Sequence, residues 1–227
     1  MSLDKTKTDS KLGKDVNLYL TECGVQTPMS IIHNFSKEDK IDNITQSFTN
    51  IMKSLELDIK DDSLKETPKR VAKMYINDLF WGLDPDNFPK ATVIENKMNY
   101  DEMVLEKNIS VKSCCEHHFM PFFSFNTIGA NIAYIPKNKV LGLSKLNRIV
   151  EYFSRRPQVQ ERLTEQIYHA LAFILGTEDV AVVIEAEHTC VKMRGVEDDN
   201  GKTITSKLGG AFKSQPQTRA EFMRLIQ

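Results

Sequence analysis

The sequence lacks a long apolar run. Nothing in its 227 residues approaches the roughly 20 consecutive apolar residues of a transmembrane helix. Its opening segment, MSLDKTKTDSKLGKD, is polar and charged without an apolar centre, which is not the pattern of a secretory signal. We therefore expect a cytoplasmic protein with no membrane partner.

Cysteine is scarce and charge is balanced. The chain has four cysteines, too few and too unevenly placed for a small disulfide scaffold, which agrees with a reducing compartment. The formal net charge of −1 gives no global reason to expect binding to nucleic acid, so any anion site must be local. The sequence also lacks the phosphate loop G-x-x-x-x-G-K-[ST], which argues against cleavage of a nucleoside triphosphate.

Apolar periodicity predicts the order of the elements. The first 15 residues have the composition of a disordered tail. Helical spacing then predicts helices over 37–57, 67–81, 144–154 and 158–175, and a short one from about Gln217. In the second of these, Thr67 is expected as the cap, Pro68 at the first helical position and Gly82 just after the end. Segments rich in β-branched and aromatic residues predict strands over 103–112, 122–135, 178–193 and 203–212. This order favours an α+β domain, with helices on one face of an antiparallel sheet and a helical arm before it.

Metal-ligand residues are concentrated in two short segments. Cys115 and His118 are three residues apart in SCCEHHFMPF, so a single turn can direct both to one ion. His188 and Cys190 are two residues apart on an expected strand, where that spacing gives a common face. Mixed thiolate and imidazole donors favour Zn²⁺ over Mg²⁺ or Ca²⁺.

Two kinds of zinc site remain open at this point. A structural site is usually closed by four protein ligands, whereas a catalytic site keeps three and leaves a position for water. If Cys115, His118 and Cys190 are the three, His117 and His188 are left to move protons, because histidine titrates near neutral pH. Cys114 would then be a spare thiol.

Two helix starts are candidates for binding an anion and a base. Ser144 is expected to cap the helix of GLSKLNRIV, and cations in a first turn oppose the helix dipole unless an anion binds there. Glu161 begins the next helix beside Gln160, and its carboxylate could accept two hydrogen bonds from a guanine edge. The candidate cations for the anion are Lys145, Arg148, Arg194, Arg70 and Lys73.

Several long motifs resemble one enzyme family. ETPKRVAKMY, CEHHFMPF, IAYIP, GLSKLNRIVEYFSRRPQVQERLT, HTCVKMRG and TSKLGGAF occur in the order found in GTP cyclohydrolase I of the bacterial type, from about Asp61 to the C-terminus. The resemblance implies a zinc-dependent enzyme that converts GTP to 7,8-dihydroneopterin triphosphate and formate, the first step of tetrahydrofolate and pterin biosynthesis. One departure is Ser124, where many members have glycine.

The resemblance also implies an architecture and an assembly. The expected architecture is the tunnelling fold, an antiparallel four-stranded sheet with two helices on one face, over residues 96–227 after a helical region at 16–95. The expected assembly is a toroidal homodecamer of two pentamers.

By the same resemblance each site residue has a role. Zinc is held by Cys115, His118 and Cys190, and His117 and His188 are catalytic. Glu161, with Gln160 beside it, binds guanine. The triphosphate contacts are Ser144, Lys145, Arg148 and Arg194, with Arg70 and Lys73 reaching in from a neighbouring subunit.

Two rival readings make different predictions. A zinc-stabilised interaction domain would close its site with Cys114 as a fourth ligand. Another tunnelling-fold enzyme of pterin or purine chemistry would bind zinc through three histidines or not at all, which the C-E-H-H and H-x-C motifs oppose.

Overall fold

The computed structural model describes residues 3–30, 34–125 and 128–227. The chain divides into two compact units, one formed from Met1–Asp4 and Pro28–Trp81 and the other from Lys5–Thr27 and Gly82–Gln227. The division of the chain into residues 1–15, 16–95 and 96–227 stays a prediction.

The smaller unit contains a pair of packed helices. Helix α2 (Lys37–Ser54) begins at a capping box, in which Ser36 accepts from the Asp39 N–H and the Asp39 carboxylate accepts from the Ser36 N–H. Helix α3 (Thr67–Met74) packs against α2 and continues into a π-helical turn, Tyr75–Leu79. The helix begins one residue earlier than expected: Glu66 rather than Thr67 is in the capping position, so Pro68 is the second helical residue and not the first.

The expected tail contains ordered structure in its described part. A 3-10 turn covers Lys5–Lys7, and helix α1 (Ser10–Glu22) is capped by Asp9, whose carboxylate accepts from the Leu12 N–H at 3.0 Å. Gly13 of α1 packs against the 3-10 turn Pro85–Asn87. Polar composition hid this helix because only a narrow stripe of it, including Val16 and Leu20, is buried.

Over the residues that the structure describes, the main sheet has seven strands rather than the four expected. Strand β8 (Val180–His188) is long enough to pair with three others, and the expected strand 122–135 is observed as two of these. Along one edge it pairs first with β5 (Ala130–Tyr134) and then with β4 (Pro121–Phe123), and along the other edge with β9 (Thr203–Leu208), all antiparallel. The sheet is completed by β2 (Val104–Ile109) beside β5, and by β3 (Lys112–Cys115) beside β4.

One pair in this sheet is parallel. The two-residue strand β7 (Pro157–Gln158) pairs with β3, with Gln158 opposite Cys115. A separate two-stranded sheet joins β1 (Val93–Glu95) to β6 (Lys139–Leu141). The antiparallel α+β class is therefore confirmed, and the strand count is corrected.

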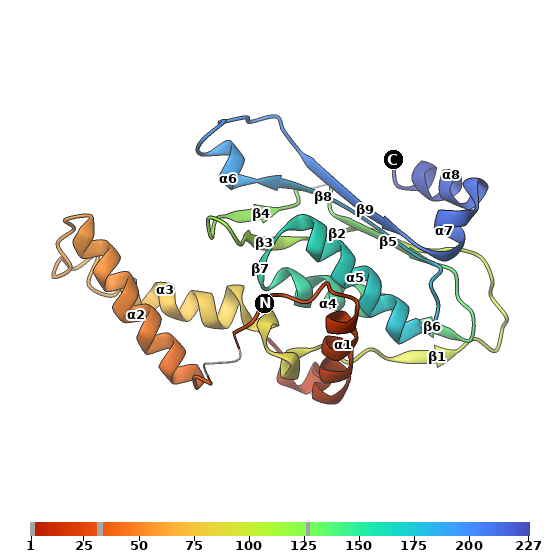
Figure 1. Cartoon of the computed structure of the whole chain (residues 1–227), viewed down its shortest axis with the longest axis horizontal. Coiled ribbons are helices and arrows are strands. Elements are labelled where there is room, and N and C mark those ends of the chain that lie inside the picture. Colours follow the sequence, from red (N-terminus) through yellow and green to blue (C-terminus); the bar gives the residue numbers. More distant parts are fainter. Residues whose placement is uncertain (1–2, 31–33, 126–127) are drawn as a thin grey trace. The chain divides into compact units, whose positions relative to one another are not determined.

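Helices cover both faces of the sheet. Helices α4 (Leu143–Ser154) and α5 (Gln160–Leu175) lie side by side along one face (Figure 1). The opposite face of β8 carries Ala181 and Val183, which pack with Phe212 and Phe222 of the C-terminal helices α7 (Gly210–Ser214) and α8 (Pro216–Leu225). None of the helices in the described ranges combines the length and apolarity of a membrane span.

Candidate metal centre and substrate site

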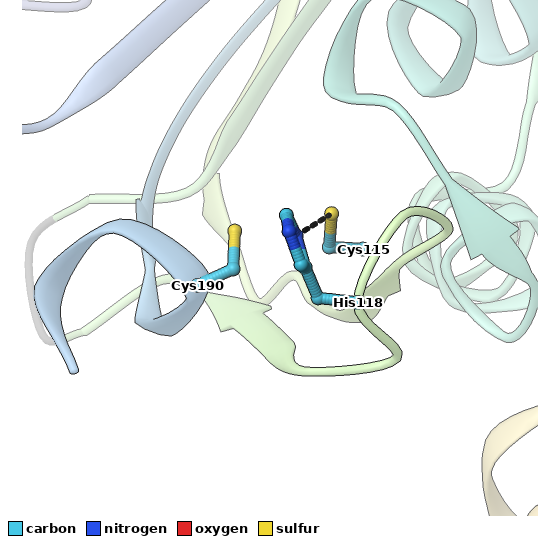
Figure 2. Close-up of side chains that lie close together, drawn as sticks. All are labelled: Cys115, His118 and Cys190. Carbon is cyan, nitrogen blue, oxygen red and sulfur yellow. Dashed lines mark hydrogen bonds between the residues drawn. The ribbon is translucent and has the colours of Figure 1, made fainter. Parts of the chain in front are cut away.

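Three of the predicted ligands lie together. Donor atoms of Cys115, His118 and Cys190 are all within 4.8 Å of one another, and Figure 2 shows the three side chains projecting to the same side. Two Zn–S bonds of about 2.3 Å at a tetrahedral angle separate the sulfurs by about 3.8 Å, so the donors need to close by at most about 1 Å. Two thiols and one imidazole are a donor set that suits zinc and leaves a fourth position for water.

The end of β3 and the tight turn after it carry the first two ligands, Cys115 and His118. The Cys115 N–H donates to the Met120 carbonyl at 2.8 Å, and the Phe119 N–H donates to the Cys115 carbonyl at 2.8 Å. Phe119 has a positive φ of 54°, which reverses the chain within this short span. The Glu116 N–H donates to the Gln158 carbonyl at 3.0 Å, so β7 holds the turn from the other side.

The third ligand is not on a strand. Strand β8 ends at His188, and Cys190 lies in the helical turn α6 (Thr189–Lys192). The expectation that His188 and Cys190 share a strand face is therefore wrong, although Cys190 still reaches the other ligands. The helical turn separates the directions of the two side chains, which brings only Cys190 into the group.

The two remaining histidines have different surroundings. His117 is exposed, with Nδ1 3.7 Å from the Cys115 sulfur and Nε2 3.9 Å from a Glu116 carboxylate oxygen. His188 is half-buried and its ring stacks on Phe122 at 4.5 Å between centroids. Burial lowers the pKa of His188, while the nearby Glu161 carboxylate acts in the opposite direction.

Cys114 is separate from the metal group. Successive residues of a strand point to opposite faces, so the Cys114 side chain leaves β3 on the side away from that of Cys115. It is buried, and burial, together with the neighbouring thiols of Cys115 and Cys190, raises its pKa to about 11. The group of donors that could hold an ion comprises the other three residues.

The candidate phosphate residues are on three elements. Helix α4 begins at Leu143 with Gly142 in the capping position, so Ser144 is inside the first turn and is not the cap that the sequence predicted. Ser144 is exposed, and Lys145 and Arg148 are partly exposed on the same helix. Lys145 also lines an apolar cavity of about 380 Å³ between the start of α4 and β6.

The other candidate cations are exposed. Arg194 follows α6, and its Nη1 lies 2.6 Å from His118 Nε2, which brings it to the metal group. Arg70 and Lys73 are exposed on α3, in the other compact unit.

The first turn of α5 carries the two candidate base-binding residues, in opposite situations. The Glu161 side chain is exposed, whereas Gln160 is buried and hydrogen-bonds to His188. Neighbouring residues on one helical turn point about 100° apart, which explains why one reaches solvent and the other does not.

Sequence reasoning missed the contacts that hold this site together. Arg162 of α5 forms a two-pronged ion pair with Glu116, with nitrogen–oxygen distances of 2.5 and 3.3 Å. The buried Gln158 donates to the Gln166 carboxamide oxygen at 2.8 Å, which ties the strand opposite Cys115 to α5. The position of an acid, Glu116, between two metal ligands was the only sequence feature that pointed to the first contact, and no sequence feature pointed to the second.

The comparisons with known proteins identify the family. The sequence model of GTP cyclohydrolase I matches residues 44–227. The chain belongs to the GTP cyclohydrolase I family. Three relatives, each named GTP cyclohydrolase 1, support this at nearly full length. The protein of Aeromonas salmonicida (strain A449) is 54% identical over 88% of this chain and 89% of its own. The protein of Vibrio vulnificus (strain YJ016) is 53% identical over 90% of this chain and 92% of its own. The protein of Vibrio campbellii (strain ATCC BAA-1116) is 52% identical over 94% of this chain and 96% of its own.

GTP cyclohydrolase I enzymes are in general metal-dependent, and the Cys-His-Cys group is where this member could hold its ion. The departure at Ser124 has a local explanation. The Ser124 hydroxyl accepts from the Val111 N–H at 2.9 Å, and the Ser124 N–H donates to the Val111 carbonyl at 3.0 Å, so this side chain joins two neighbouring segments without touching the metal group.

Proposed function

We propose that this chain converts GTP to 7,8-dihydroneopterin triphosphate and formate at a zinc site formed by Cys115, His118 and Cys190. Membership of the GTP cyclohydrolase I family carries the proposal. Bound zinc would lower the pKa of a coordinated water to about 7 and so supply a nucleophile at neutral pH. We further propose the tunnelling fold, a toroidal homodecamer and a cytoplasmic location, in keeping with the family.

The protein's own residues bind and orient the substrate. The exposed Glu161 carboxylate accepts hydrogen bonds from N1–H and the 2-amino group of guanine, which adenine lacks in that pattern. The triphosphate lies at the start of α4, where backbone N–H groups and the helix dipole favour an anion. Its side-chain contacts are Ser144, Lys145, Arg148 and Arg194, joined by Arg70 and Lys73 of a neighbouring subunit.

Two histidines move protons at named atoms. As a water oxygen adds to C8 of guanine and loses a proton, His188 donates a proton to N7. The bond between C8 and N9 then breaks as the new hydroxyl group loses its proton and N9 gains one, which leaves a formyl group on N7. His117, which is exposed beside Cys115, exchanges protons with water and substrate during the release of formate and the later ring closure. The phosphate contacts supply binding and orientation through these steps rather than chemistry.

The activity is tested by incubating the purified, zinc-loaded protein with GTP. One formate and one pterin, scored as its fluorescent oxidised form, are expected for each GTP consumed. GTP that survives in the presence of bound zinc and an intact oligomer would overturn the proposal.

A second measurement separates ligands from proton carriers. Cys115→Ala and Cys190→Ala are expected to lose the metal, whereas Cys114→Ala, the matched thiol control, keeps both metal and activity. His117→Ala and His188→Ala are expected to keep the metal and to fail in turnover. Loss of metal from Cys114→Ala would instead support a closed four-ligand site and the rival reading as an interaction domain.

A further inference from the structure

Both polar atoms of the Gln160 side chain have partners within the protein. This side chain is only 2% exposed. The carboxamide nitrogen lies 3.0 Å from the Ile184 carbonyl, 3.0 Å from the Thr203 carbonyl and 3.2 Å from the Thr205 hydroxyl. The carboxamide oxygen lies 2.8 Å from Nε2 of His188.

These partners fix which way the carboxamide points. Carbonyl oxygens only accept hydrogen bonds, so the group of Gln160 that faces Ile184 and Thr203 must be the NH₂ donor. The group that faces His188 is then the oxygen, which only accepts. His188 must therefore carry a hydrogen on Nε2, and in its neutral form Nδ1 is the bare nitrogen.

The plane of the His188 ring is fixed by a second contact. Phe122 lies directly opposite His188 in the β4–β8 pairing, and the two rings stack at 4.5 Å with planes only 8° apart. The stack restrains the tilt of the imidazole, and the hydrogen bond to Gln160 restrains its rotation in the plane.

We propose that Gln160 is a positioning residue that holds His188 in the Nε2–H tautomer, so that Nδ1 is the atom that exchanges a proton with the substrate. The idea rests on the proposed function for the role of His188. It replaces the expectation that Gln160 contacts guanine, and leaves the exposed Glu161 as the base-binding residue of this turn.

The wild-type tautomer is the direct test. The chain has five histidines, so protein labelled with ¹⁵N only at histidine Nε2 gives few signals, and the signal of His188 is assigned by its loss in His188→Ala. Solid-state NMR of the assembled, zinc-loaded protein is expected to show a protonated Nε2 at His188. An unprotonated Nε2 would overturn the proposal, whether or not the protein turns over GTP.

Substitutions of Gln160 separate orientation from binding. Gln160→Met removes the acceptor, so signals of both His188 tautomers are expected, with kcat lower by about 10- to 100-fold because the proton carrier is no longer held in place. The Kd for GTP is expected to stay within about twofold. A raised Kd with unchanged kcat would make Gln160 a substrate contact and refute the proposal.

Two further variants serve as comparisons. Gln160→Glu keeps an acceptor for His188 but turns a second oxygen toward the Ile184 and Thr203 carbonyls, so it should preserve the Nε2–H signal while lowering stability. Tyr168→Phe is the matched control, because Tyr168 is on the same helix, is 3% exposed and donates its hydroxyl hydrogen to the Glu178 carboxylate rather than contacting His188. It should lower stability and leave the His188 tautomer and kcat unchanged. A shift of the tautomer in Tyr168→Phe would mean that any loosening of α5 has this effect, which would also refute the specific role of Gln160.

Discussion

The ion pair between Glu116 and Arg162 joins the turn that carries the metal ligands to the helix that carries Glu161. Its nitrogen–oxygen distances are 2.5 and 3.3 Å, and the side chains are 25% and 20% exposed. We expect Glu116→Gln to loosen this junction. The variant keeps the shape of the side chain and removes only its charge and one acceptor.

The burial of the pair sets the expected magnitude. Exposed ion pairs contribute about 0.2–1 kcal/mol, and breaking a fully buried pair costs about 3–5 kcal/mol. A two-pronged pair that is about three-quarters buried lies between these limits, so we expect a coupling free energy of about 1–2 kcal/mol.

A double-mutant cycle measures that coupling. Glu116→Gln, Arg162→Met and the double variant are unfolded in denaturant at one fixed concentration of protein and zinc, because both affect the apparent stability of a metal-binding oligomer. The cycle removes any effect that Glu116 has through His117, 3.9 Å away, since that effect is present with and without Arg162.

An exposed pair provides the control. Lys65 and Asp62 approach within 2.6 Å, but their side chains are 52% and 95% exposed, so the same cycle on them should give at most about 0.5 kcal/mol. A coupling for Glu116 and Arg162 as small as that of the control would refute the argument that this pair holds the turn to α5.

Two further predictions concern stability. The Asp179 side chain is 16% exposed, and burial by itself would raise its pKa. The Ala211 N–H at 2.7 Å and the Lys137 ammonium outweigh burial, so the pKa of Asp179 is lowered. A carboxylate with a lowered pKa stabilises the fold at pH values above its unfolded pKa of about 4, so Asp179→Asn should lower the free energy of unfolding by about 1 kcal/mol at pH 7. The difference in this free energy between variant and wild type should shrink as the pH falls below about 4, and a difference that stays constant down to pH 2 would contradict the argument. Gly13→Ala would stabilise an isolated helix by about 0.5–1 kcal/mol, but here a Cβ would lie 2.0 Å from the Pro85 carbonyl oxygen. The variant should therefore have a lower Tm in thermal unfolding, and a raised Tm would mean that α1 does not pack against that turn.

The helices beside the sheet could be predicted because their apolar spacing is strong. Leu146, Ile149, Val150 and Phe153 form one fully buried face of α4, and their spacing alone located the helix to within one residue at its start. Helix α1 was missed because its buried stripe is narrow and its remaining positions are polar. Strands β3 and β7 were missed because they are four and two residues long, too short for a period-2 pattern to appear, whereas β4 and β5 both fall within the single strand expected over 122–135.

The identities of the metal ligands could be predicted from residue type, but the backbone conformation expected at Cys190 was wrong. Cys, His and Cys were expected to meet, and they do, yet Cys190 reaches the group from a helical turn rather than from the end of β8. What sequence could not give is the direction of each side chain at the start of α5. Gln160 and Glu161 are adjacent in the sequence, and only the packing of α5 against β8 and β9 decides that the first turns inward to His188.

The proposed contribution of a neighbouring subunit can be tested by mixing subunits. Arg70 lies on α3, in a different compact unit from Cys115. If Arg70 acts across a subunit boundary, each active site combines Cys115 of one chain with Arg70 of another. Cys115→Ala and Arg70→Ala homo-oligomers would then both be inactive, because every site in either assembly lacks one of the two residues.

Hybrids of the two variants distinguish action across the boundary from action within one chain. In a random one-to-one mixture, an intact site needs Cys115 from an Arg70→Ala chain and Arg70 from a Cys115→Ala neighbour, so about a quarter of sites are complete and about a quarter of the wild-type activity should return. If Arg70 acts within its own chain, every chain that keeps Cys115 lacks Arg70, and no hybrid site is complete. Mixing the separately assembled variants without dissociating them is the control, since recovery then requires exchange of subunits. A co-assembled hybrid that stays inactive while its zinc content reaches half that of the wild type would therefore refute the shared site.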